Sequence, residues 1–388
     1  MKRNKYHLSN YSFPLVATIL ATGIMGLIYI NSASPDHVKK QVIGLVLGLI
    51  AMVVVSLIDY NKLFHFIWLI YVGNLLLLLA VKFFGKTVGG AKRWLGFGGF
   101  SLQASEITKI AMVLFVAYFI REHEDEMGDF KALAKLAFWC AIPLFMVVSQ
   151  PDLSTTLDIC FILIGMIFVG GLDAKIIKKA ILIGVPLFVA FIFYIQTPNP
   201  LFIKEYQVTR IMSFINPEKY ADTTAYQQAN SIIAIGSGQL FGKGLNSNEI
   251  SDSNTTISDV DEMEESSEVT VTVKDTNLVS EQQTDFIFSI IGEETGFVGC
   301  MITIGLLLCI VFQCLWIGSR SGDLAGRLIC VGIAGLICFQ SFINIGVATF
   351  ILPNTGLPLP FISYGPTSLV CNMAGMGLVL NVGLQRRY

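Results

Sequence analysis

The sequence predicts an all-α polytopic membrane protein with about ten transmembrane helices. Of its 388 residues, 54% are hydrophobic and only 14% are charged, and the mean hydropathy is +0.67. Long apolar runs recur along the chain. Soluble proteins carry about 25% charged residues, and a soluble chain of this length has no way to bury so much apolar surface. The composition excludes a soluble enzyme, a disordered chain and a secreted disulfide-rich protein.

The predicted membrane spans follow from run length, because a transmembrane helix needs about 20 mostly apolar residues. Backbone groups in lipid must be satisfied within the segment, so helices rather than strands are expected. The first run follows three basic residues, and because further runs follow it, we interpret it as a retained helix and not a signal peptide. The candidate spans are 12–31, 41–58, 62–82, 104–121, 133–149, 155–172, 175–196, 284–314, 323–346 and 365–384.

The distribution of Lys and Arg predicts the orientation. An even number of spans places both termini on the same side. Once the long segment 197–283 is set aside, the short loops on the side of the termini hold more Lys and Arg than the opposite side. Such loops are usually cytoplasmic. We therefore predict both termini to be cytoplasmic, and 197–283 to be a long extracellular loop between helices 7 and 8.

Residues 1–388 are interpreted as a single membrane domain, within which the large loop 197–283 differs in composition. Its first part, 199–245, mixes apolar and polar residues and is predicted to lie in the membrane interface. Its second part, 246–283, contains ten acidic residues and one basic residue. We predict that this acidic insert is mobile and solvated.

Cysteine and histidine positions exclude several kinds of chemistry. The eight cysteines lie in apolar runs and form no CxxC, so they are interpreted as small hydrophobic residues and not as a disulfide frame or zinc site. No histidine follows His123. A Ser-His-Asp arrangement in the second half and a HExxH metal site are therefore excluded.

A glycine-rich segment, 89–103, carries the first polar cluster. Its small residues allow the backbone to approach a ligand closely. Lys92 and Arg93 offer donors to an anion such as a phosphate, and Trp94 suits the membrane interface. The alternative interpretation is an interfacial loop with an aromatic belt.

Two predicted helices begin with charged residues. Ser105 is expected to cap the span 104–121, where Glu106 and Lys109 stand three residues apart. Asp152, near the start of 155–172, either caps that helix or lines a break in it at membrane depth.

Carboxylates also stand where the large loop re-enters the membrane. Asp285 opens the span 284–314, and as an alternative to a functional role it is the N-cap of that helix. Glu293 and Glu294 follow an apolar stretch of the same span. Ionisable groups at this depth need partners or an aqueous cavity.

A proline-rich segment, 353–365, precedes the last span. Three prolines and two glycines within it predict a fixed, non-helical path. Ser363, Tyr364 and Thr367 can present hydroxyl groups to a ligand. The alternative interpretation is a rigid connector.

Together these segments resemble the SEDS family, the RodA, FtsW and SpoVE group. The resemblance spans nearly the whole chain, with five motifs in the same order. They are GAKRWLGFGGFSLQASEITK, QPDLST, AIGSGQLFGKG, TDFIFSIIGEETGFVG and NIGVATFILPNTGLPLPFISYGPTSL. The resemblance implies a ten-helix peptidoglycan glycosyltransferase that polymerises lipid II at the outer face of the cytoplasmic membrane.

The resemblance also assigns individual residues. Asp285 matches the family's essential outer-loop aspartate. Trp94, beside Arg93, matches a functionally important tryptophan, and Glu106 and Lys109 match the charged pair that opens the fourth helix. The sequence departs from the family pattern at Ala104, Ser154 and Pro366 and in the Ser-Glu-Gln-Gln run at 280–283.

The implied reaction is glycosyl transfer from a polyprenyl pyrophosphate donor, with inversion. Asp285 is the expected catalytic base for the acceptor hydroxyl. A divalent cation, Mg or Mn, is a possible aid, since carboxylates and pyrophosphate bind hard cations. The residues expected to bind substrate are Lys92, Arg93, Trp94, Glu106, Lys109, Asp152, Arg210, Lys243, Ser363 and Tyr364.

The resemblance further implies partners and a place in the cell. The expected partners are lipid II, membrane lipids and a class B penicillin-binding protein, with no nucleic acid. The expected location is the cytoplasmic membrane, as a multi-pass protein of cell-wall synthesis in shape, elongation or division. Two alternatives stay open: a lipid II flippase or transporter, which broken helices and buried charge also fit, and a non-catalytic scaffold.

Overall fold

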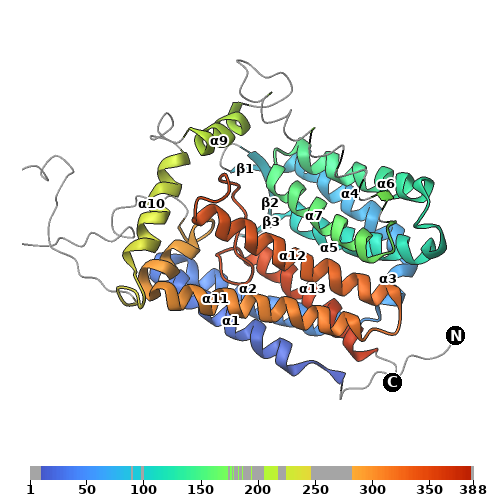
Figure 1. The fold of residues 1–388 in the computed structure, drawn as a ribbon. Helices are drawn as coiled ribbons and strands as arrows, with labels where there is room; N and C mark the ends of the chain where they lie inside the picture. Colours follow the sequence, from blue (N-terminus) through green and yellow to red (C-terminus); the bar gives the residue numbers. More distant parts are fainter. Residues whose placement is uncertain are drawn as a thin grey trace, which may run out of the picture.

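The computed structural model describes residues 10–88, 91–97, 100–173, 205–216, 224–245 and 282–385, and isolated positions between 174 and 204. It is a bundle of long helices with a small sheet at one end (Figure 1). The helices are α1 (Phe13–Ala33), α2 (Pro35–Leu57), α3 (Tyr60–His65), α4 (Ile67–Phe84), α5 (Ala104–Glu122), α6 (Phe130–Ser149), α7 (Leu153–Val169), α9 (Glu205–Ile215), α10 (Thr224–Ser237), α11 (Ile287–Ser319), α12 (Leu324–Ala348) and α13 (Pro366–Leu384), with a 3-10 turn at Glu124–Glu126.

Every predicted span except 175–196 corresponds to a described helix; that span and the acidic insert lie outside the described residues. Seven of the described helices are long and apolar enough to cross a membrane, and α7 is a shorter apolar helix. α5 has the length, but it carries four charged residues. The prediction of a polytopic all-α membrane protein is confirmed.

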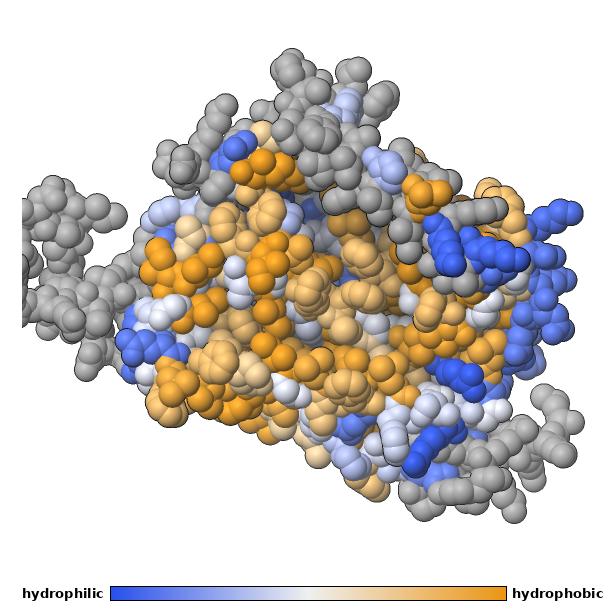
Figure 2. Space-filling model, in the orientation of Figure 1, coloured by the Kyte–Doolittle hydropathy of each residue, from blue (hydrophilic) through white to orange (hydrophobic). Residues whose placement is uncertain are grey.

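The outer surface of the bundle is apolar. Figure 2 shows a broad hydrophobic band over the described helices, with hydrophilic residues concentrated toward its two ends. Large side chains such as Phe84, Phe130 and Phe145 are at least 74% exposed. Water would penalise such exposure, whereas lipid tails do not. All eight cysteines lie in described helices and are free, as the sequence predicts.

The centre of the bundle is formed by α12 and α13, whose hydrophobic stretches are 67% and 78% buried. α13 packs closely along α2. Gly377 permits this approach, because a side chain there would meet the main-chain oxygen of Met52 at 2.6 Å. Small residues allow helices in membranes to pack backbone to backbone.

α11 is kinked at Gly296, whose φ of +63° and ψ of −160° suit only glycine. The segment 238–244, which follows α10, packs against this kink. Its main chain exchanges hydrogen bonds with α11, from Lys243 N to Glu293 O and from Phe297 N to Gln239 O, at 2.9 and 2.8 Å. Two of the sequence motifs, AIGSGQLFGKG and TDFIFSIIGEETGFVG, therefore form one packed unit.

A three-stranded antiparallel sheet, which the sequence analysis did not predict, precedes α5. Its strands are β1 (Lys86–Val88), β2 (Ala91–Phe97) and β3 (Phe100–Gln103), in the order β1-β2-β3. Trp94 pairs with Gln103 across β2 and β3. The sequence does contain a signal for it, because the Gly-Gly pairs at 89–90 and 98–99 are typical of β-hairpin turns.

Two predicted helix caps are wrong. The N-cap of α5 is Gln103, and no side chain caps it, because the Ser105 hydroxyl already lies inside the helix and donates to Asp152 at 3.0 Å. α11 begins at Ile287 with Phe286 as its N-cap. Asp285 is therefore not a helix cap.

Candidate active site

The segment 353–365, called the connector below, joins α12 to α13 at the end of the bundle that holds the sheet. Its C-terminal part is held by Gln41 of α2. The Gln41 side chain donates to Ser363 O and accepts from Gly365 N, both at 3.1 Å. A buried amide that both donates and accepts fixes the two main-chain groups it bonds. The connector is thus anchored, as the rigid-connector interpretation expects.

Asp285 lies against the connector and is partly buried. Its main-chain oxygen accepts a hydrogen bond from Asn344 Nδ2 of α12 at 2.8 Å. Gly356 of the connector has φ +76°, and a Cβ there would lie 3.2 Å from Asp285 Oδ2. Glycine therefore suits this position for two reasons. It adopts the left-handed conformation without strain, and it leaves room for the carboxylate.

Arg210 of α9 reaches the residue before Gly356. Its Nη1 donates to Thr355 O at 3.2 Å, and Ser154 Oγ of α7 donates to the same oxygen. Arg210 is partly exposed. A cationic side chain and the Asp285 carboxylate therefore contact adjacent residues of the connector. Ser154 also helps to hold this segment.

Arg93 and Asp152 form a second site on the same end. Arg93 Nη1 lies 3.7 Å from Asp152 Oδ1, with the Arg93 side chain 20% exposed, and its Nη2 donates to Pro151 O. Asp152 is the N-cap of α7, where it accepts from Thr155 N. The capping interpretation of Asp152 is therefore confirmed. Its role in substrate binding stays a prediction.

Lys92 and Trp94 lie in β2 and are partly exposed. Lys92 Nζ donates to Phe83 O, at the end of α4, at 2.8 Å. One of its donors is thus engaged by the fold, and the ammonium stays near the sheet.

Glu106 and Lys109 belong to a buried charged cluster. Lys109 Nζ lies 3.0 Å from Glu106 Oε1 and 3.7 Å from Asp158 Oδ2, and it donates to Gln340 Oε1 at 2.8 Å. Glu106 Oε2 accepts from Ser368 Oγ. Both residues of the predicted pair are at most 2% exposed. They join α5 to α7, α12 and α13, and their contact with substrate stays a prediction.

Each of the two glutamates of α11 has a polar partner. Lys243 Nζ pairs with Glu293 Oε1 at 2.9 Å, and Ser32 Oγ of α1 donates to Glu294 Oε1. Lys243 keeps 21% of its side chain exposed. It therefore stabilises the segment 238–244 on α11 and still reaches the surface.

The two hydroxyl residues of the connector differ in their surroundings. Ser363 Oγ donates to Thr284 O at 2.6 Å and accepts from Leu359 N at 2.7 Å, so the fold uses it. The Tyr364 ring packs edge-on against His37, 4.4 Å between ring centres. Burial raises the pKa of the Tyr364 phenol, which keeps its hydroxyl protonated and able to donate at neutral pH.

No group of three or more His, Cys, Asp or Glu side chains able to hold a metal ion occurs in the part of the chain that the structure describes. The divalent cation stays a prediction.

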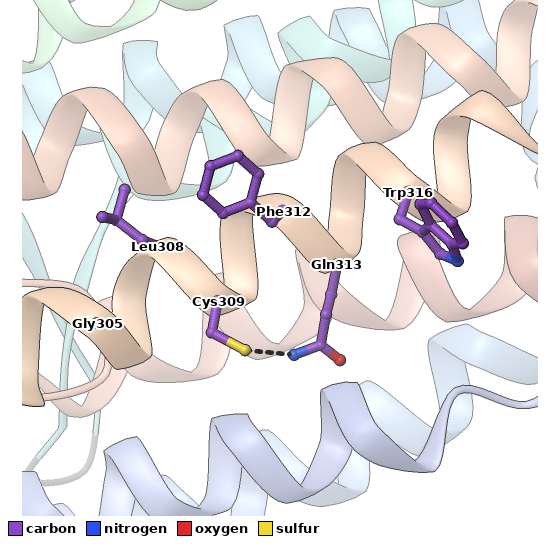
Figure 3. Close-up of a pocket in the computed structure, with 6 residues that line it drawn as sticks. All are labelled: Gly305, Leu308, Cys309, Phe312, Gln313 and Trp316. Carbon is purple, nitrogen blue, oxygen red and sulfur yellow. Dashed lines mark hydrogen bonds between the residues drawn. The ribbon is translucent and has the colours of Figure 1, made fainter.

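An apolar groove of about 490 Å³ lies elsewhere, on α11. Figure 3 shows Leu308, Phe312 and Trp316 along the helix, with Gln313 beside Cys309. Gln313 Nε2 donates to Cys309 Sγ at 3.2 Å and to Thr18 of α1 at 3.0 Å. At 1.5 Å per residue the groove begins about 27 Å along α11 from its start. It is separate from Asp285.

Four residues that contact the predicted ones were given no role by sequence reasoning: Asp158, Asn344 and Ser368, which lie within the polar clusters, and Gln340, which was missed. A signal was present for the two amides, because Gln340 and Asn344 interrupt an otherwise apolar span four residues apart. Polar side chains within a membrane helix mark structural or functional contacts.

The fold and site define a polytopic helical membrane protein in which a carboxylate and a cationic side chain contact adjacent residues of the connector. A family model described as "Cell cycle protein", for FtsW, RodA and SpoVE, matches residues 7–254 and 269–388. The chain belongs to the FtsW/RodA/SpoVE family and is a multi-pass protein of the cytoplasmic membrane. The interruption of the match falls inside the acidic insert.

Its relatives carry consistent names. The chain is 29% identical to "Probable peptidoglycan glycosyltransferase FtsW" of Geobacter metallireducens, over 100% of this chain and 98% of that protein. It is 29% identical to "Peptidoglycan glycosyltransferase RodA" of Treponema pallidum (98% and 99% covered). It is 30% identical to "Peptidoglycan glycosyltransferase MrdB" of Escherichia coli (96% and 93% covered).

Solved structures agree with the fold. One, from a study titled "Structural coordination of polymerization and crosslinking by a peptidoglycan synthase complex", superposes with a TM-score of 0.75 at 26% identity, covering 96% of this chain and 97% of that one. The crystal structure of the Thermus thermophilus rod shape determining protein RodA gives a TM-score of 0.68 at 25% identity, covering 97% and 98%.

Proposed function

We propose that this protein is a peptidoglycan glycosyltransferase that polymerises lipid II at the outer face of the cytoplasmic membrane. Its membership of the family and the names of its relatives support the activity. One observation carries the proposal for the site. Arg210 and Asp285 contact two adjacent residues of the connector, Thr355 and Gly356. That a carboxylate and a guanidinium both contact this one short segment supports a shared site for a base and a cation.

Each of the two groups has a role in glycosyl transfer. Asp285 takes the proton from the acceptor sugar hydroxyl as that oxygen attacks the anomeric carbon of the donor. The bond from this carbon to the pyrophosphate oxygen breaks, and the electron pair leaves with the polyprenyl pyrophosphate. Arg210 offers planar, charged donors to that leaving group. A direct displacement of this kind inverts the anomeric configuration.

Other Lys and Arg side chains near the connector are assigned supporting roles. Arg93, Lys92 and Lys243 are all partly exposed, and their charge attracts an anionic lipid to the connector end. The buried Lys109 is less suited to direct contact with substrate, since it is 1% exposed. We assign it to the support of the site.

A class B penicillin-binding protein is the proposed partner. The likeness to a structure titled as a peptidoglycan synthase complex supports this pairing. Polymerised strands require crosslinking, and a crosslinking enzyme bound beside the site receives them directly.

The test is polymerisation of lipid II by the purified protein, alone and with the partner. Asp285→Ala is expected to lower the rate at least about 100-fold, as the loss of a general base does. Asp36→Ala is the matched control, because Asp36 is an exposed carboxylate at the start of α2. Polymer formed at the wild-type rate by Asp285→Ala removes Asp285 from the mechanism. Movement of lipid II across liposomes without any polymer would favour the transport alternative.

A further inference from the structure

Two buried amide side chains of α12, Gln340 and Asn344, lie on one face of the helix, because residues four apart face the same way. They are 0% and 1% exposed. Their neighbours in α12 are mostly apolar. A polar side chain buried at membrane depth is costly unless its hydrogen bonds are satisfied. Their partners therefore indicate why the chain tolerates them.

Asn344 joins Asp285 to the connector. An amide nitrogen supplies two donors, and Asn344 Nδ2 uses them on Asp285 O at 2.8 Å and on Leu357 O at 2.7 Å. Leu357 follows Gly356, the residue that faces the Asp285 carboxylate. One side chain thus fixes both main-chain segments that flank this carboxylate.

Gln340 bonds the next residue of the connector. Its Nε2 donates to Pro358 O at 2.7 Å, and its Oε1 accepts from Lys109 Nζ at 2.8 Å. An ammonium group is a donor only, so it requires the amide oxygen on its side and turns the amide nitrogen toward the connector. The buried charged cluster therefore orients Gln340 for this bond.

We propose that Asn344, supported by Gln340, is a positioning residue that holds the Asp285 carboxylate against Gly356 in its reactive orientation. The inference rests on the proposed function, because it assigns a role in the same site. Neither amide needs to contact the substrate. The contacts form a continuous path from Lys109 through Gln340, the connector and Asn344 to Asp285.

The test substitutions change the hydrogen-bond donors of the Asn344 and Gln340 side chains. Asn344→Asp keeps the size of the side chain but turns its donors into acceptors that face two main-chain oxygens. Asn344→Leu removes the polar group. Gln340→Met removes only the bond to Pro358 and the acceptor for Lys109. Ser341→Ala is the matched control, because Ser341 is buried on the same helix and its hydroxyl has no hydrogen-bond partner among the described residues.

The experiment measures kcat and KM for lipid II with the full chain and its partner. Misplacement of a catalytic group by about 1 Å costs about 100-fold. We expect kcat to fall about 30- to 100-fold in both Asn344 variants, with KM within about threefold. The expected fall for Gln340→Met is about 3- to 10-fold. Ser341→Ala keeps wild-type kinetics.

Amide hydrogen exchange of the connector, 353–365, provides a readout that does not need activity. It is expected to accelerate in the Asn344 and Gln340 variants and to stay unchanged in Ser341→Ala. This measurement and Gln340→Met decide the question if the Asn344 variants do not fold.

Three results would overturn the proposal: wild-type kcat in Asn344→Leu, a rise in KM at constant kcat, or unchanged connector exchange in the Asn344 variants. If the wild-type protein makes no polymer, the proposed function fails, and connector exchange alone then decides the positioning role.

Discussion

The two ends of the bundle both gather polar residues, but they use their carboxylates differently. At the end opposite the connector, Asp59 caps α3 and Asp323 caps α12, accepting from Asn61 N and Gly326 N at 2.9 and 3.0 Å. At the connector end, Asp285 stands just outside α11 without capping it. Its carboxylate instead faces Gly356 of the connector.

At the opposite end, the polar side chains form hydrogen bonds with one another. Tyr60 donates through its hydroxyl to Asp323 Oδ1 at 2.8 Å and through its main chain to Asn381 Oδ1 at 3.1 Å. Gln385 donates to both Asp59 and Asn381. These bonds join α3, α12 and α13. A carboxylate that caps a helix inside such a network contributes to stability.

The comparison teaches that the role of a carboxylate depends on what already bonds it. Asp323 and Asp285 each stand near the first turn of a long helix, but Asp323 is the N-cap of α12, whereas the N-cap of α11 is Phe286. Substitutions at the connector end are therefore expected to affect catalysis, and substitutions at the opposite end to affect stability. The buried charged cluster that contains Lys109 is expected to affect both.

The largest effect is expected from Lys109→Met, which leaves the buried Glu106 and Asp158 without their cation. Removal of one partner from a buried ion pair costs about 3–5 kcal/mol. The free energy of unfolding in detergent is expected to fall by about this amount. Lys39→Met, at an exposed position of α2, is the control. If the variant instead loses polymerisation while its free energy of unfolding is unchanged, Lys109 contacts the substrate directly.

Gly356→Ala is expected to act mainly on catalysis. The added Cβ enters the space beside Asp285 Oδ2 and strains a left-handed residue, at a cost of about 1–3 kcal/mol. We expect the polymerisation rate to fall about 100-fold through displacement of the carboxylate. Gly165→Ala, in α7 with open space around it, is the control. A fully active Gly356→Ala protein would show that the connector does not constrain Asp285.

The smallest effect is expected from Tyr60→Phe at the opposite end. It removes one hydrogen bond to the Asp323 carboxylate, worth about 1.5–3 kcal/mol. The free energy of unfolding is expected to fall by that amount while polymerisation per folded molecule stays at the wild-type value. A matching fall in specific activity would contradict the separation of roles between the two ends.

Much of the fold could be predicted from the sequence because apolar runs of membrane length have few alternatives. The spans 104–121 and 323–346 match α5 and α12 to within two residues at each end. The start of α2 at Pro35, six residues before its predicted start, was missed because Asp36, Lys39 and Lys40 make that turn polar. The sheet was missed because its strands are short and apolar runs dominate the pattern.

The candidate site was predicted in part. Asp285 and the connector, which the sequence placed 68 or more positions apart, meet in the fold. Ser363 was expected to face a ligand, but its hydroxyl bonds Thr284 and Leu359. A hydroxyl in a sequence motif looks the same whether it contacts a ligand or the main chain.

The sequence by itself determined the membrane class, the helical spans that the structure describes and the family, and it predicted Asp285 as the key carboxylate, because these depend on composition, run length and local motifs. Only the tertiary structure decided which groups hold that carboxylate. Asn344 with Asp285, and Lys109 with Gln340, are separated by 59 and 231 positions. Such pairs meet through the way helices pack, and no local pattern specifies which side chains that packing brings within hydrogen-bond distance.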